Sequence, residues 1–124
     1  MPSIPPAVVL GAGLPGDDPA SVEYAGAALA EEAARHRPEA VVSWNDTTDV
    51  LLAHVVARTL GIRRRVVVAD LGRLIVEDVL PGERTAVVTA GGGPGTGLEP
   101  LLRAVAGHGG RVVCVCSVTG EGAE

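Results

Sequence analysis

The fold is decided by the stretch Val41-Val42-Ser43-Trp44-Asn45-Asp46-Thr47-Thr48, in which a short apolar run gives way to a polar loop. The next residues, Val50 to Leu60, carry apolar side chains at helical spacing and end at Gly61, a residue suited to the left-handed backbone that closes helices. Val66-Val67-Val68-Ala69 follows as a second strand-like run. A strand, a helix and a strand in this order predict a right-handed βαβ unit and therefore a parallel sheet.

The same alternation of apolar runs and helical stretches extends in both directions from this unit. Runs such as Val66–Val68 and Val112–Val115 are apolar throughout, which is typical of strands buried on both faces. We therefore predict an α/β fold of three layers, with a short, mostly parallel sheet, in a single domain over residues 1–124. Further strands are expected at Ala7–Leu10, Thr85–Val88 and Arg111–Val118, helices from Asp17 to about His36 and from Leu98 to Ala106, and either a short strand or a turn at Leu74–Val76.

The charge of the chain argues against a nucleic-acid partner. The net charge is −5, and all ten basic residues are arginine, so no dense basic stripe is expected. Arg63-Arg64-Arg65 is the one local cluster, and we expect it to be a solvated helix-to-strand turn rather than a phosphate-binding patch. Because the chain has no lysine, a lysine Schiff base, a lysine general base and a P-loop lysine are excluded.

Cysteine spacing and the apolar runs indicate the compartment. Cys114 and Cys116 lie two apart in an apolar run, unlike the C-x-x-C pairs of zinc or redox sites, and are expected to be buried core thiols. The N-terminal residues 1–6 lack the charged start of a signal peptide, and no segment reaches transmembrane length. We expect a cytoplasmic protein with no membrane partner.

A glycine-rich loop, Gly91 to Gly97, follows the strand at Thr85–Val88 and precedes the last helix. Several unhindered N–H groups at a helix start could bind an anion, although a purely structural turn is an equal alternative. The loop superficially matches a P-loop, but Leu98 and Glu99 replace the lysine and hydroxyl residues of that motif. A dinucleotide-binding loop is also disfavoured, because no acidic residue follows at the expected distance.

Two segments give the chain a family resemblance. Pro38 to Thr48, with the helix to Gly61 and the strand at Val66, resembles the first βαβ unit of type I phosphoribosyltransferases, especially the orotate enzymes. Leu80-Pro81-Gly82-Glu83-Arg84-Thr85-Ala86-Val87-Val88-Thr89-Ala90 and the glycine loop fall where that family has its phosphoribosyl diphosphate motif, and Gly109 to Val115 resembles its closing strand. The resemblance implies a type I phosphoribosyltransferase-like core lacking a full hood and catalytic loop.

The departures from the family pattern concern its active site. Two adjacent acidic residues that contact the ribose hydroxyls and support the metal-bound diphosphate are replaced by Thr89 and Ala90, so no Mg²⁺ or other cofactor is expected. The segments that carry basic residues in the family are neutral to acidic or short here: Ala69 to Gly72, and Asp70 to Glu83. By resemblance, the remaining phosphate cradle is Gly93, Pro94, Gly95, Thr96 and Gly97.

We therefore expect a degenerate phosphoribosyltransferase-like protein without standard transferase activity. It would bind a phosphorylated small molecule or act as an assembly module, as a homo-oligomer or with another protein. The alternatives are recruitment of the fold to a different reaction in specialised metabolism, with Asp49 as a further pocket residue, or an atypical active transferase.

Asp46 and Asp49 could bind a cation or act as acid and base, but helix capping is the preferred interpretation. Candidate ligand-binding residues beyond the cradle are Trp44, Asn45, Asp46, Thr47, Thr48 and Thr89, and no catalytic or metal-ligating residue is assigned.

Overall fold

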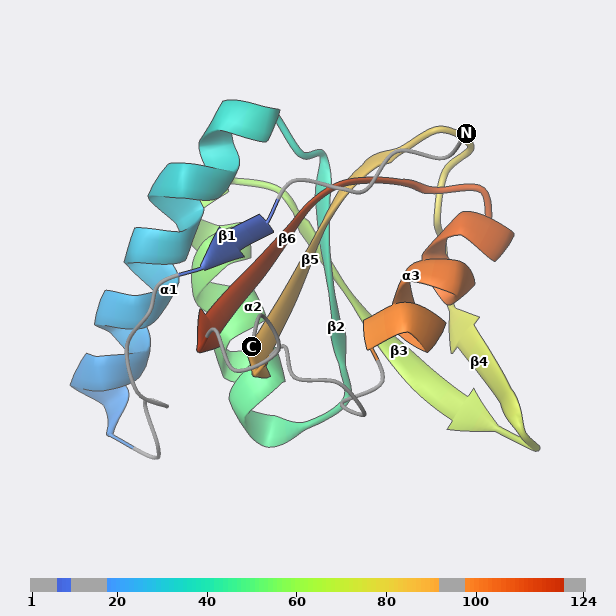
Figure 1. Cartoon of the computed structure of the whole chain (residues 1–124), viewed down its shortest axis with the longest axis horizontal. Coiled ribbons are helices and arrows are strands. Elements are labelled where there is room, and N and C mark those ends of the chain that lie inside the picture. Colours follow the sequence, from blue (N-terminus) through green and yellow to red (C-terminus); the bar gives the residue numbers. More distant parts are fainter. Residues whose placement is uncertain (1–6, 10–17, 92–97, 120–124) are drawn as a thin grey trace.

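A computed structural model describes residues 7–9, 18–91 and 98–119 of the chain. Within these residues the strands form one six-stranded sheet in the order β1-β6-β5-β2-β3-β4 (Figure 1). The pairs β1/β6, β6/β5, β5/β2 and β2/β3 are parallel, and only β3/β4 is antiparallel, as the mostly parallel prediction requires. The elements are β1 (Ala7–Val9), α1 (Pro19–Ala33), the 3₁₀ turn η1 (Ala34–His36), β2 (Ala40–Trp44), α2 (Thr47–Leu60), β3 (Arg63–Asp70), β4 (Arg73–Val76), β5 (Arg84–Gly91), α3 (Leu98–Gly107) and β6 (Arg111–Thr119).

The helices lie on both faces of the sheet, which confirms the three-layer prediction. Helices α1 and α2 cover one face and α3 covers the other (Figure 1). The strand alternation follows this division, since Val41 packs in the α1/α2 cluster and its neighbour Val42 in the α3 cluster. The chain crosses from β2 to β3 through α2. It crosses from β5 to β6 through α3, in the opposite direction along the sheet. Right-handed crossovers that run in opposite directions place their helices on opposite faces.

Helices α1 and α2 approach each other closely at Gly26. A Cβ atom at Gly26 would lie 2.5 Å from Val55 Cβ, so only glycine fits at this contact. Helix α2 ends as expected at Gly61, whose φ is +70° and whose N–H donates to the carbonyl of Arg58. The lack of a side chain at Gly26 therefore allows α1 and α2 to pack this closely.

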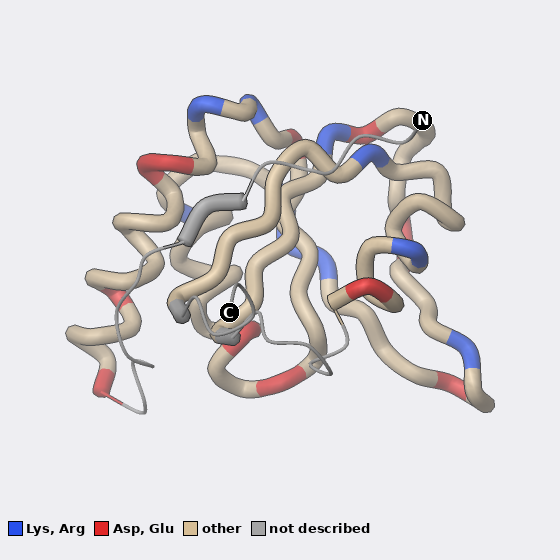
Figure 2. Tube along the Cα trace, in the orientation of Figure 1, with Lys and Arg blue, Asp and Glu red and all other residues tan. Residues whose placement is uncertain are grey.

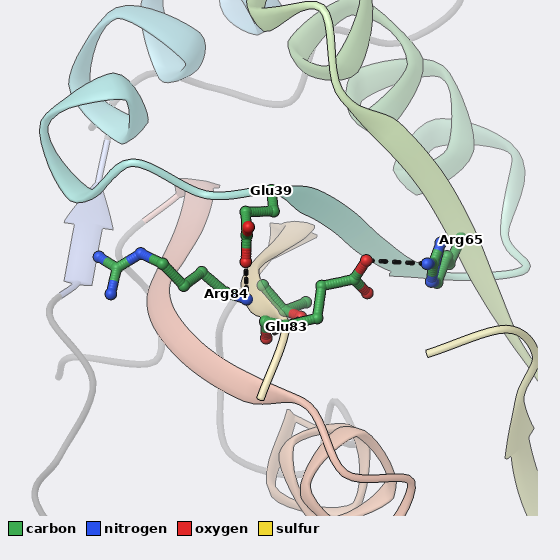
Figure 3. Close-up of polar contacts among 5 residues, drawn as sticks. Glu39, Arg65, Glu83 and Arg84 are labelled. Atoms are coloured by element: carbon green, nitrogen blue, oxygen red, sulfur yellow. Dashed lines mark hydrogen bonds and ion pairs between the residues drawn. The ribbon is translucent and has the colours of Figure 1, made fainter. Parts of the chain in front are cut away.

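The Arg63-Arg64-Arg65 cluster differs from its prediction as a solvated turn. All three residues belong to β3, which pairs with β2 from Arg63 onward. Arg63 and Arg64 are exposed, but Arg65 points into the α3 side of the molecule and forms an ion pair with Glu83. The N–H group at Nη2 donates to Glu83 Oε2 at 2.9 Å, and both side chains are more than nine-tenths buried (Figure 3). Charge runs suggest solvent exposure, but here strand alternation places Arg65 on the same face as the buried Val67.

Two further sequence expectations can be compared with the structure. Leu74–Val76, left open between strand and turn, lies in β4, which forms a hairpin with β3 across Leu71-Gly72. Cys114 and Cys116 are free and buried, as predicted for core thiols. No helix among the described residues is long and apolar enough to cross a membrane.

Candidate functional site

The candidate site lies where the strand order reverses, at the carboxyl ends of β2 and β5. These two strands are neighbours in the sheet, yet the chain leaves them toward opposite edges and opposite faces. In open α/β sheets this reversal leaves a crevice outside the strand ends, which is where ligands bind. The segments at this edge are Trp44–Asp49 after β2 and Thr89–Gly91 at the end of β5.

The loop after β2 brings together five of the predicted site residues. Trp44 is half-buried and packs against the apolar cluster on the α3 side, so part of its ring serves the core. Asn45, Asp46 and Thr47 are exposed, and Thr48 is half-buried in the first turn of α2. This loop therefore presents an amide, a carboxylate and a hydroxyl group at the strand end.

Asp46 occupies the N-cap position of α2 without capping through its side chain. Its backbone is extended, with φ −116° and ψ 141°, and its carbonyl accepts from the Val50 N–H at 2.8 Å. The side chain makes no capping hydrogen bond, so the capping interpretation is wrong for this carboxylate. The Asp46 side chain therefore remains available for a ligand at the carboxyl end of β2.

Asp49, three residues into the helix, has a different role. It is only 6 % exposed, and its Oδ1 accepts a hydrogen bond of 2.8 Å from the Ala90 N–H at the end of β5. Burial raises the pKa of the Asp49 carboxyl, the Ala90 hydrogen bond lowers it, and the nearby Asp46 charge raises it, with burial the largest effect. Asp49 thus ties the start of α2 to the end of β5 across the strand reversal.

Sequence reasoning treated Asp49 mainly as a helix cap, although a signal for its burial was present. The buried residues Leu52, Ala53 and Val56 of α2 lie three, four and seven positions after Asp49, on the same helix face. An acidic residue at the head of an apolar stripe must find a partner on the sheet. The partner is a backbone N–H group, which side-chain patterns do not reveal.

Thr89 and Ala90, next to the last residue of β5, offer neither a carboxylate nor an exposed polar group. Both residues are buried, at 6 % and 8 % exposure, and Ala90 packs in the α1/α2 cluster. Thr89 lies opposite Ser117 of β6, which is also buried. Of the described residues 45–49 and 89–91, only Asp46 and Asp49 are charged, and both are acidic. Figure 2 shows acidic segments around the start of α2. The predicted cradle Gly93–Gly97 lies outside the described residues.

Solved structures share this arrangement of strands and helices. A purine phosphoribosyltransferase from Pyrococcus horikoshii superposes with a TM-score of 0.63 and 20 % identity over 89 % of this chain and 75 % of its own. An adenine phosphoribosyltransferase from Thermoanaerobacter pseudethanolicus gives a TM-score of 0.68 and 16 % identity over 81 % of this chain and 68 % of its own. The chain has a type I phosphoribosyltransferase-like fold.

A third solved structure similar to this chain is that of a hypothetical protein from Neisseria gonorrhoeae with bound ppGpp. Its TM-score is 0.58, with 14 % identity over 93 % of this chain and 70 % of its own. No protein-family model matches the chain, and no curated protein matches its sequence. The phosphoribosyltransferase-like fold predicted from the sequence is therefore confirmed by structural likeness, while the chemistry depends on the residues of the site.

Proposed function

We propose that the chain is a degenerate phosphoribosyltransferase-like protein that binds a phosphorylated small molecule without transferring a phosphoribosyl group. The observation that carries this proposal is the end of β5, where Thr89 and Ala90 supply a hydroxyl and a methyl group, both buried. In the family that the sequence resembles, two carboxylates at this place contact the ribose hydroxyls and support the metal-bound diphosphate. Without them, the developing positive charge of an oxocarbenium-like transition state has no anionic partner from this strand.

Asp49 does not replace the missing acidic pair. Its carboxyl group is buried and accepts a hydrogen bond from the Ala90 N–H, and burial, which disfavours the anion, raises its pKa. A carboxylate that holds Mg²⁺ needs oxygen atoms open to the ion and its water shell. We therefore propose that binding of the ligand does not require Mg²⁺, and that the phosphate contacts come from backbone N–H groups.

The proposed ligand carries a phosphate group, held by resemblance in the cradle Gly93–Gly97 with the Thr96 hydroxyl. Trp44, Asn45, Asp46, Thr47, Thr48 and Thr89 would complete the site. Because the neighbouring structure from Neisseria gonorrhoeae holds ppGpp, a guanosine polyphosphate belongs among the compounds to test. Self-association or association with another protein forms the second half of the proposal. A cytoplasmic setting would suit the free thiols Cys114 and Cys116.

Isothermal titration calorimetry tests the ligand half of the proposal. The compounds are phosphoribosyl diphosphate, ribose 5-phosphate, nucleoside monophosphates and ppGpp, each titrated with and without Mg²⁺. We expect saturable binding of at least one of them, with the same affinity in both conditions. Thr96→Val, which removes the hydroxyl group at nearly constant volume, should weaken that binding, whereas the matched change Thr59→Val on the exposed side of α2 should not. If none of the compounds gives a heat of binding, the ligand half of the proposal is refuted.

A different enzymatic reaction on this fold is the second candidate, favoured by the buried Asp49 carboxyl with its raised pKa. Such a group can act as a general acid or base when a substrate reaches it. Incubating the protein with nucleotides and sugar phosphates, followed by mass spectrometry, would detect a changed compound. This candidate requires that Asp49→Asn abolish the conversion while the variant stays folded. Conversion that survives Asp49→Asn would exclude Asp49 as the acid or base.

A further inference from the structure

Strand β4 ends the sheet, and its outer edge faces away from the other strands. It pairs with β3 through a regular antiparallel register from Val67↔Val76 to Asp70↔Arg73. No other strand in the described part of the chain pairs with it, and Figure 1 shows it at the right-hand margin of the sheet. An edge of this kind offers backbone N–H and C=O groups to another strand.

The sequence of β4 does little to block such pairing. Arg73-Leu74-Ile75-Val76 contains no proline, and its register with β3 shows no bulge. Its one charged residue, Arg73, is the first of the strand, and Glu77 follows in the turn directly after Val76. Proteins that keep an edge strand unpaired commonly place a charge, a proline or a bulge within it, and here only the shortness of the strand limits pairing.

Arg73 at the start of β4 and Glu77 in the turn directly after it make the segment 73–77 complementary to itself. When two copies pair antiparallel with Ile75 opposite Ile75, Arg73 of each copy lies opposite Glu77 of the other, and Leu74 lies opposite Val76. Opposite charges across a strand pair stabilise it, and like charges destabilise it. This one register matches both charges and apolar residues across a two-fold axis.

Exposed apolar side chains flank the same edge. Val68 pairs with Ile75 on the sheet face opposite α3 and is 39 % exposed, while Leu71 at the hairpin tip is 94 % exposed. An apolar tip held at a φ of +52° is unusual for a solvated hairpin, where glycine or asparagine is favoured.

We propose that β4 pairs antiparallel with β4 of a second copy of this chain, joining the two sheets into one. The proposal deepens the assembly half of the proposed function by naming the surface and the partner. It does not depend on the ligand, because β4 lies at the edge of the sheet and the strand reversal lies between β5 and β2. A failed titration and a failed dimer are therefore distinguishable results.

Sedimentation equilibrium of the full chain, at concentrations up to about 0.1 mM, tests the proposal. The expected mass is twice the 12.5 kDa of one chain. Arg73→Glu and Glu77→Arg each place like charges at both ends of the paired strands, so each should raise the dissociation constant by about tenfold or more. The double variant Arg73→Glu/Glu77→Arg restores opposite charges and should recover the wild-type constant within about threefold.

Arg35→Glu is the control, because it makes the same charge change at an exposed side chain next to α1. We expect it to leave the dissociation constant unchanged, and circular dichroism verifies that each variant is folded. A monomeric wild-type chain overturns the proposal. So do single charge changes that leave the dimer as tight as before, and a double variant no tighter than the single ones.

Discussion

Arg65→Met removes the guanidinium group from a buried ion pair and leaves the Glu83 carboxylate without its cation. The two side chains are 6 % and 4 % exposed, so water cannot replace the lost partner. Glu83 Oε1 already has no hydrogen-bond partner among the described residues, and Oε2 would lose its bond to Arg65 Nη2 (Figure 3). A buried charge left without compensation costs about 3–5 kcal/mol.

Such a loss is a large part of the 5–15 kcal/mol that stabilises a typical domain. At about 4 °C per kcal/mol for a chain of this size, the melting temperature should fall by about 12–20 °C. Urea unfolding followed by circular dichroism measures the free energy of unfolding, and calorimetry measures the melting temperature. The control Arg103→Met breaks the exposed ion pair with Glu99 and should cost about 1 kcal/mol or less.

The double variant Arg65→Met/Glu83→Leu separates the value of the pair from the cost of leaving one charge alone. Because both charges are replaced by apolar side chains of similar size, the double variant should be within about 1.5 kcal/mol of the wild type, or more stable. The reasoning is refuted if Arg65→Met costs less than about 1 kcal/mol. It is also refuted if the double variant loses the sum of the two single losses.

Two further predictions concern contacts of α1 and α2. Gly26→Ala should destabilise the protein by about 1–2 kcal/mol, because its Cβ would lie 2.5 Å from Val55 Cβ and overpacking outweighs the better helix propensity of alanine. The control Gly107→Ala, with open space around it, should be neutral or stabilising. Equal effects of the two changes on the free energy of urea unfolding would contradict the packing argument. Asp49→Ala should cost about 1–3 kcal/mol by leaving the Ala90 N–H without its acceptor, whereas Asp49→Asn keeps an acceptor. Because the pKa of Asp49 is raised in the folded state, its charged form opposes folding. The wild type should therefore lose stability relative to Asp49→Asn as the pH rises from about 3 to 7. A difference in the free energy of unfolding between the two proteins that stays constant with pH would contradict this prediction.

The parallel sheet and its helices could be predicted from the sequence because local patterns decide them. The helical spacing of Val50–Leu60, the stop at Gly61 and the apolar strands each act over a few residues. Arg65 could not be placed in the same way, because its burial depends on Glu83, which lies eighteen residues later, directly before β5. The pairing of Leu74–Val76 with β3 was equally undecided, since a four-residue strand carries little periodic signal.

The candidate site was only partly predictable. The loop Trp44–Thr48 was expected at a strand end, and the parallel order of the strands places it there beside the end of β5. The bond from the Ala90 N–H to Asp49 was not expected, because backbone donors leave no mark on the side-chain pattern. Sequence reasoning therefore identified the strand ends where the site lies, but not the buried hydrogen bond that joins the start of α2 to the end of β5.

A phosphoribosyl transfer assay tests the central claim most directly. Purified protein is incubated with phosphoribosyl diphosphate, Mg²⁺ and orotate, adenine, guanine or hypoxanthine, and nucleotide formation is followed by chromatography. We predict no nucleotide above the level of the protein-free reaction, because Thr89 and Ala90 stand near the end of β5 where the family that the sequence resembles has its acidic pair. Turnover at an ordinary enzymatic rate, about 1 s⁻¹ or faster, would contradict the account.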